Sequence, residues 1–176
     1  MPVTRTRAAR LAMLATLGGA TLVLSAAMRP STATFGGPWI SIEAPVNPYD
    51  QTARGALMLV HTFHHGTRVN LPVVGRAEGL VDGERKTVDL RLTKSAEVGT
   101  HSVRNEWGSK GTWTVLLTAR EGQTSIQAVA EINADGSVGK IGVPSKNGRY
   151  HPLSVAEIDQ GLRDRTSARV ARAADR

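Results

Sequence analysis

The sequence predicts an all-β fold, an antiparallel β-sandwich of about seven to eight strands, followed by one short C-terminal helix. Two observations carry this prediction. Short segments in which apolar and polar residues alternate recur between residues 39 and 143. Glycine-containing turns separate these segments, as tight β-hairpins require.

The first expected element is a signal peptide or membrane anchor helix at residues 1–27. Arg5, Arg7 and Arg10 precede an uncharged run over residues 11–27, which ends in the small-x-small pattern that a signal peptidase cuts. The run is shorter than the roughly 20 apolar residues of a spanning helix, which favours a cleaved signal over an anchor. The expected localisation is therefore extracytoplasmic, either periplasmic or secreted. If the segment is retained, residues 11–27 would contact the membrane.

A flexible leader is expected at residues 28–38, which are rich in Ser, Thr, Gly and Pro. The β-sandwich domain then spans residues 39–143. Its first strands are expected at residues 39–44, 56–63, 71–80 and 87–93. In the last of these, Val88, Leu90 and Leu92 point to one face and polar residues to the other. Pro45 and Pro48 predict a structured loop between the first two strands.

Three dipeptides predict hairpins between the later strands. They are Asp82-Gly83, Glu121-Gly122 and Asp135-Gly136. Each stands between two alternating runs, where a tight turn needs positive φ. The segments that begin at Trp113 and Ile126 are therefore expected to pair, with a flexible edge strand at residues 136–142.

Residues 144–176 predict a linker and a basic C-terminal helix that ends in a tail. Ser154 is the expected N-cap and Glu157 closes a capping box, so the helix should begin at Val155. Beyond Gly161 the apolar face gives way to arginines and alanines. Two docked turns and a fraying basic end are expected.

The composition limits the classes of function. The chain has 176 residues, enough for one domain after the signal, and no cysteine, which excludes disulfides and thiolate metal sites. The formal net charge is +7, but the three arginines of the signal region leave +4 without them, and the C-terminal tail holds most of that excess. The domain itself is nearly neutral, so no nucleic-acid partner is expected. The basic tail could contact anionic lipid head groups or another acidic surface. We interpret it as a solubility feature, because Asp164 and Asp175 interrupt the arginines.

Two neighbouring segments resemble a known kind of domain. Val98-Gly99-Thr100-His101-Ser102-Val103 is followed by Lys110-Gly111-Thr112-Trp113, which opens the apolar strand up to Leu117. This pattern, from Gly99 to Leu117, resembles the YtkA-like and FixH-like extracytoplasmic domains. The resemblance implies an immunoglobulin-like sandwich. The chain differs from those domains in having His101 at an aromatic position and Met58 as the only methionine of its middle region.

The cluster that could carry chemistry is His61-Thr62-Phe63-His64-His65. Imidazoles bind Cu and Zn, so His61, His64, His65 and His101 from another strand are a candidate metal site. On a regular strand His61 and His65 would share a face while His64 faces away, and a turn at residues 64–66 would relax this. The alternative is that these histidines pack, form hydrogen bonds or lie on a solvent-exposed loop, without any cofactor.

No motif indicates an enzyme, because the chain has neither Gly-x-Ser-x-Gly nor His-Glu-x-x-His. Trp107, in an expected loop, is either an exposed residue that binds a partner or a half-buried anchor of the loop. The first functional hypothesis is an exported, noncatalytic module that binds a protein partner in the cell envelope. The second is an extracytoplasmic copper- or zinc-binding protein that uses the histidine cluster.

Overall fold

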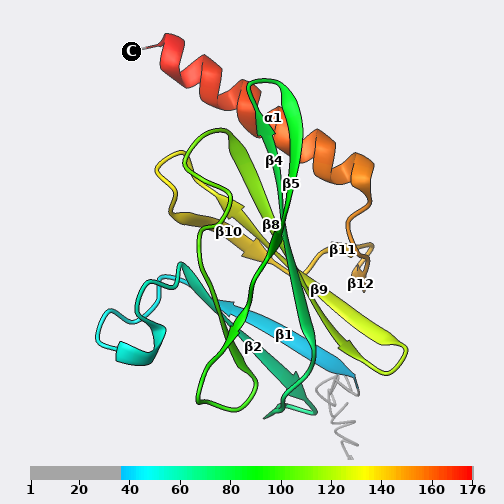
Figure 1. The fold of residues 1–176 in the computed structure, drawn as a ribbon. Helices are drawn as coiled ribbons and strands as arrows, with labels where there is room; N and C mark the ends of the chain where they lie inside the picture. Colours follow the sequence, from blue (N-terminus) through cyan, green and yellow to red (C-terminus); the bar gives the residue numbers. More distant parts are fainter. Residues whose placement is uncertain (1–36, 176) are drawn as a thin grey trace, which may run out of the picture. The chain divides into compact units, whose positions relative to one another are not determined.

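The structure, a computed structural model, describes residues 37–175 and consists mostly of antiparallel β-strands followed by one helix (Figure 1). The predicted signal or anchor and nearly all of the predicted leader lie outside the described residues. The strands are β1 (Pro38–Glu43), β2 (Met58–His64), β3 (Thr67–Arg68), β4 (Val73–Val81), β5 (Glu84–Leu90), β6 (Thr93–Lys94), β7 (Thr100–Val103), β8 (Thr112–Glu121), β9 (Thr124–Ile132), β10 (Val138–Gly142), β11 (Ser145–Lys146) and β12 (Arg149–Tyr150). The helices are a short 3-10 turn, η1 (Gln51–Ala53), and α1 (Val155–Ala174).

The longer strands form two antiparallel sheets. In the first sheet the order is β1-β2-β7-β6, with β3 also paired to β2. In the second sheet the order is β10-β9-β8-β4-β5, and β11 and β12 form a separate small hairpin. β1 contacts β8 and β9 of the second sheet (Figure 1). The two sheets are therefore packed against each other.

One hydrophobic core lies between these sheets, built from the inward residues of both. The first sheet contributes Ile40, Met58, Val60 and Val103, and the second contributes Ala77, Val81, Leu90, Trp113, Val115, Leu117, Ala119, Ile126, Ala128, Ala130 and Ile132. Side chains alternate between the two faces of the second sheet, which places Trp113, Val115 and Leu117 in this core as the sequence predicted. β8 is buried on both faces, because Leu116 on the opposite face packs against α1. The alternation fixes which side chains face away from the core.

The three predicted hairpins all form. Asp82 and Gly83 have φ values of 52° and 83° in the β4–β5 turn, and Gly122 and Gly136 also have positive φ. A further tight turn, at Asn147 and Gly148, joins β11 to β12 inside the segment predicted as a linker. Its flanking strands have two residues each, so no alternating pattern marks them.

Helix α1 begins as predicted, with the Ser154 and Glu157 capping box formed. Ile158 and Leu162 pack against Leu116 on the outer face of the second sheet, with Leu80 and Val129 around them. The predicted docked turns form, with Ile158 and Leu162 buried, but the predicted fraying end is wrong, since the helix continues to Ala174. Its second half is held by hydrogen bonds from polar side chains, described below, which an apolar period does not reveal. Among residues 37–175, no helix has both the length and the apolar character needed to cross a membrane.

A buried carboxylate connects the β4–β5 hairpin to α1. Glu78 is 3% exposed and lies 2.6 Å from Arg76 Nε and 2.9 Å from Arg85 Nη2. The Thr87 hydroxyl donates a third contact at 2.7 Å. Arg85 also pairs with Asp159 of α1. A buried charge is tolerated only when it is paired and hydrogen-bonded, and Glu78 meets that condition.

Candidate functional site

His61 lies on β2 and faces away from the core, because its neighbour Val60 is a core residue. Its Nδ1 is 3.1 Å from Thr100 Oγ1 on β7, and its Nε2 is 3.0 Å from Glu43 Oε2 on β1. The side chain is 6% exposed. Both ring nitrogens therefore already have partners on the neighbouring strands.

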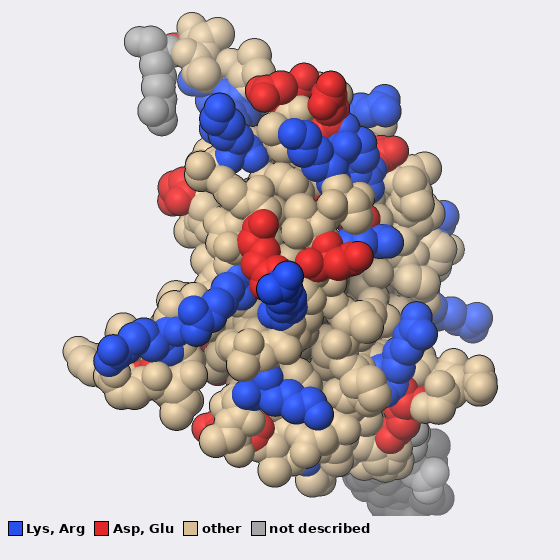
Figure 2. Space-filling view, in the orientation of Figure 1, with Lys and Arg blue, Asp and Glu red and all other residues tan. Residues whose placement is uncertain are grey.

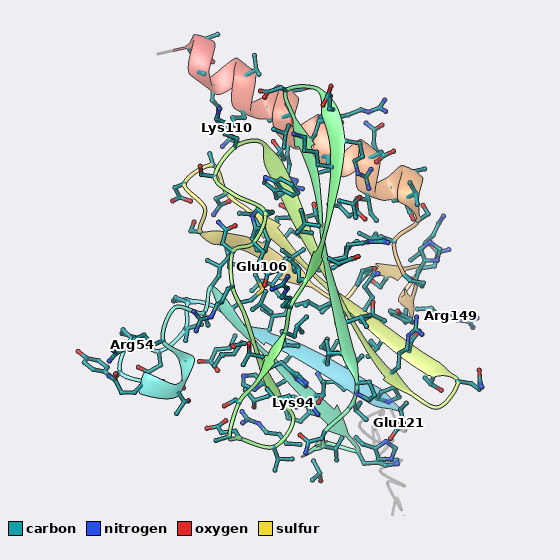
Figure 3. The ribbon with its side chains drawn as sticks, viewed as in Figure 1. Arg54, Lys94, Glu106, Lys110, Glu121 and Arg149 are labelled. Atoms are coloured by element: carbon teal, nitrogen blue, oxygen red, sulfur yellow. The ribbon has the colours of Figure 1, made fainter. Side chains whose placement is uncertain are left out.

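His64 and His65 lie where β2 turns into β3. His65 has a φ of 48°, followed by Gly66 at 79°, so the chain turns at this point. The two imidazole rings are edge to face, with centroids 4.2 Å apart. His64 Nδ1 is 2.8 Å from Glu121 Oε2, at the end of β8 (Figure 3). This contact joins the two sheets at one end of the core.

His101 lies on β7 opposite Val60 and is 4% exposed. Its Nδ1 has no hydrogen-bond partner. Burial, and secondly the charge of Lys94, lower the pKa of His101 below its usual value. The folded protein therefore favours the neutral imidazole.

We expect this histidine to make the protein less stable in acid. In the unfolded chain His101 binds a proton near pH ~6.5, whereas in the folded chain it binds one only at lower pH. Its contribution to the free energy of unfolding is therefore fully present above that pH and is lost as the pH falls below it. The loss is limited to about 1.4 kcal/mol per pH unit for one proton. Urea unfolding of the wild type and of His101→Leu, between about pH 8 and 5, measures how the free energy of unfolding falls with pH. The wild type should lose more stability than the variant, and parallel profiles would contradict this expectation.

The candidate metal-binding histidines do not converge on one point. His61 and His64 are three residues apart on β2, an odd number, so they point to opposite faces, and His101 lies on the core side. In residues 37–175, no group of three or more His, Cys, Asp or Glu side chains is placed to hold a metal ion. Metal binding by His61, His64, His65 and His101 stays a prediction. Sequence reasoning missed the histidine partners Glu43, Thr100 and Glu121, because they are distant in the chain.

Trp107 is a core residue. It is 7% exposed, and its ring centroid is 6.5 Å from that of Trp113. Asn105 accepts hydrogen bonds from the backbone N–H groups of Trp107 and Gly108, which fixes the loop around it. This burial matches the loop-anchor alternative and contradicts an exposed contact residue. Trp107 would have to leave the core to touch a partner.

A groove of about 600 Å³ lies beside the histidine turn, on the outward face of the first sheet. It is lined by Gly37, Trp39, Ser41, Phe63, His65 and Gly66. Trp39 and Phe63 are directly opposite each other on β1 and β2, and Trp39 is 37% exposed. Paired aromatics on an outward sheet face make a largely apolar surface. The sequence did not reveal this pair because it does not give the strand register.

Comparison with known proteins gives no further assignment: the chain matches no protein-family model, no curated protein and no solved structure.

Proposed function

We propose that this chain is an exported, noncatalytic immunoglobulin-like module that binds a protein of the cell envelope. An extended segment of that protein would add to the free edge of β1. One observation carries the proposal: β1 is at the end of its sheet, and the groove at Trp39 and Phe63 lies on the outward face of the same strand. Strand addition combines backbone hydrogen bonds with pockets for alternate side chains, and β1 has both features.

One edge of β1 has no paired strand among residues 37–175, where β1 pairs with β2 alone. The Thr62 N–H donates to Gly99 O at 2.8 Å, so the backbone of Thr62 points away from β1. Ile40 is opposite Thr62, so its backbone N–H and C=O groups point away from β2, as in every pair of this kind in an antiparallel ladder. The N–H and C=O groups of Ile40 and Ile42 therefore face the free edge.

The other sheet edges are less suited to a partner strand. β5 carries Glu84, Arg85, Lys86 and Asp89, and such charges discourage edge pairing. β10 has an irregular register between Val138 and Ile141. β6 has two residues. The sequence of β1, Pro-Trp-Ile-Ser-Ile-Glu, has one charge, at its end.

The immunoglobulin-like fold, the export and the noncatalytic role each have their own support. Two antiparallel sheets around one core are consistent with an immunoglobulin-like sandwich, which the resemblance to YtkA-like and FixH-like domains implies. Export is inferred from the arginines and the uncharged run of residues 1–27. The noncatalytic role is inferred from the missing catalytic motifs and from His61, whose ring nitrogens are both engaged.

Copper or zinc binding is the alternative function. The feature that favours it is His64, which contacts the ring of His65 and the carboxylate of Glu121, although these three groups are not placed to hold one ion together. His61 and His101 would contribute only after rearrangement, since the first is bonded to Glu43 and the second is buried. We therefore rank this function second.

Site-specific photocrosslinking tests the proposed function. A photoreactive residue replaces Ser41 in the groove of the full chain, or Lys86 on β5 as a control, in cells that export the protein. We expect one defined adduct with an envelope protein from position 41 and none from position 86. Phe63→Ser should abolish the adduct, because it removes the apolar groove wall, whereas Val74→Ser, an exposed site on the other sheet, should not.

Three outcomes would overturn the proposed function. They are the absence of an adduct at position 41, the same adduct at both positions, and an adduct only with a second copy of this chain or with its own residues 1–36. Circular dichroism of each variant establishes that the fold is retained. Fractionation of the cells shows on which side of the membrane the adduct lies.

A further inference from the structure

A second groove of about 590 Å³ lies between the last three turns of α1 and the β8–β9 strands. Three arginines of α1 line it, Arg165, Arg169 and Arg172. Their spacing of four and three residues puts them on one face of the helix. Lys110, at the end of the loop before β8, lies at the same end of the domain (Figure 3). Figure 2 shows Lys and Arg side chains, with Asp and Glu side chains among them, along this end of the domain.

Neutral groups hold these guanidinium groups in place. Arg165 donates to Trp113 O at 3.0 Å and to the Thr114 hydroxyl. Arg169 donates to Gly111 O at 3.2 Å. No ion pair within the described part of the chain includes Arg165, Arg169 or Arg172. Backbone carbonyls and a hydroxyl therefore orient Arg165 and Arg169 without neutralising their charge.

The groove carries an excess of positive charge, with Arg165 partly buried and Arg169 and Arg172 exposed. Its lining includes one acidic residue, Glu131, against three arginines. Burial lowers the pKa of Arg165, and the charge of Glu131 opposes this effect. A bound anion would stabilise the charge of Arg165, whose guanidinium group has lost part of its hydration.

We propose that this groove binds a phosphate ester, with Arg169 and Arg172 as the groups that contact the phosphate. Guanidinium groups match phosphate oxygens with paired, charge-assisted hydrogen bonds. Ile132, Ala168 and Ala173 add apolar surface to the lining, against which the carbon part of an ester can pack. The phosphate is either that of a soluble ester or the head group of an anionic phospholipid. This site is separate from the β1 edge and does not depend on it.

Thermal unfolding of the full chain in neutral detergent tests the site. The probe is glycerol 3-phosphate, compared with chloride at equal ionic strength. At about ten times the dissociation constant we expect Tm to rise by about 3 °C in the wild type. Arg169→Gln with Arg172→Gln should lose this rise. Arg91→Gln with Arg149→Gln removes the same charge from exposed positions elsewhere and should keep it.

Vesicle flotation distinguishes the two sources of phosphate. For each variant, the fraction bound to phosphatidylglycerol vesicles is divided by the fraction bound to phosphatidylcholine vesicles. Any contact that residues 11–27 make equally with both kinds of vesicle does not change this ratio. If the phosphate is that of a lipid head group, the preference for phosphatidylglycerol should be about tenfold higher in the control variant, Arg91→Gln with Arg149→Gln, than in the groove variant, Arg169→Gln with Arg172→Gln. A soluble ester predicts the Tm rise without that difference. The proposal is overturned if the Tm rise and the vesicle preference are each equal in the two variants, or if both are absent in the wild type. The Tm in chloride shows whether each variant retains its fold.

Discussion

Replacing Gly79 with alanine is expected to lower the free energy of unfolding by about 3 kcal/mol. Gly79 lies on β4 directly opposite Trp113 of β8. A Cβ atom at this position would lie 2.4 Å from Trp113 Cε3 and 2.5 Å from Cζ3. The indole cannot move away easily, because it is 4% exposed and its Nε1 donates to Lys110 O at 2.6 Å. The new methyl group must therefore displace the strand or the ring.

Urea unfolding followed by circular dichroism measures this loss. Gly142→Ala is the matched control, since a Cβ atom there meets nothing within 4 Å on the edge strand β10. The control should change the free energy of unfolding by less than about 0.5 kcal/mol. An equal effect of the two substitutions would contradict the packing of Trp113 on Gly79.

Leu162→Ala is expected to lower the free energy of unfolding by about 3 kcal/mol as well. The Leu162 side chain is 1% exposed and packs with Ile158 against Leu116 of β8. Its truncation leaves a cavity between α1 and the second sheet. The same unfolding experiment compares it with Val170→Ala, at a position of α1 that is 65% exposed. A small effect of Leu162→Ala would indicate that α1 does not dock through this face.

The strand arrangement could largely be predicted because local chemistry determines it. The dipeptides Asp82-Gly83, Glu121-Gly122 and Asp135-Gly136 supply the backbone conformations of tight turns, and all three hairpins form. The start of α1 could be predicted for the same reason, since Ser154 and Glu157 cap it locally. The length of α1 could not, because Arg165 and Arg169 bond to backbone carbonyls of residues more than 50 positions away.

The candidate sites required the tertiary structure. Strand alternation correctly separates His61 from His64, but it does not reveal Glu43 and Glu121 as their partners. The groove at Trp39 depends on the register of β1 against β2, which no single segment encodes. Trp107 illustrates the converse, because a loop position in the sequence becomes a core position when the two sheets close.

Amide hydrogen exchange of β1 tests whether a partner strand adds to its free edge. The full chain is compared alone and in complex with the protein that position 41 crosslinks. We expect the amides of Ile40 and Ile42, which face the free edge of β1, to exchange at least about tenfold more slowly in the complex. Amides of the free edge of β5 should keep their rates. Unchanged exchange at Ile40 and Ile42 would contradict strand addition at β1.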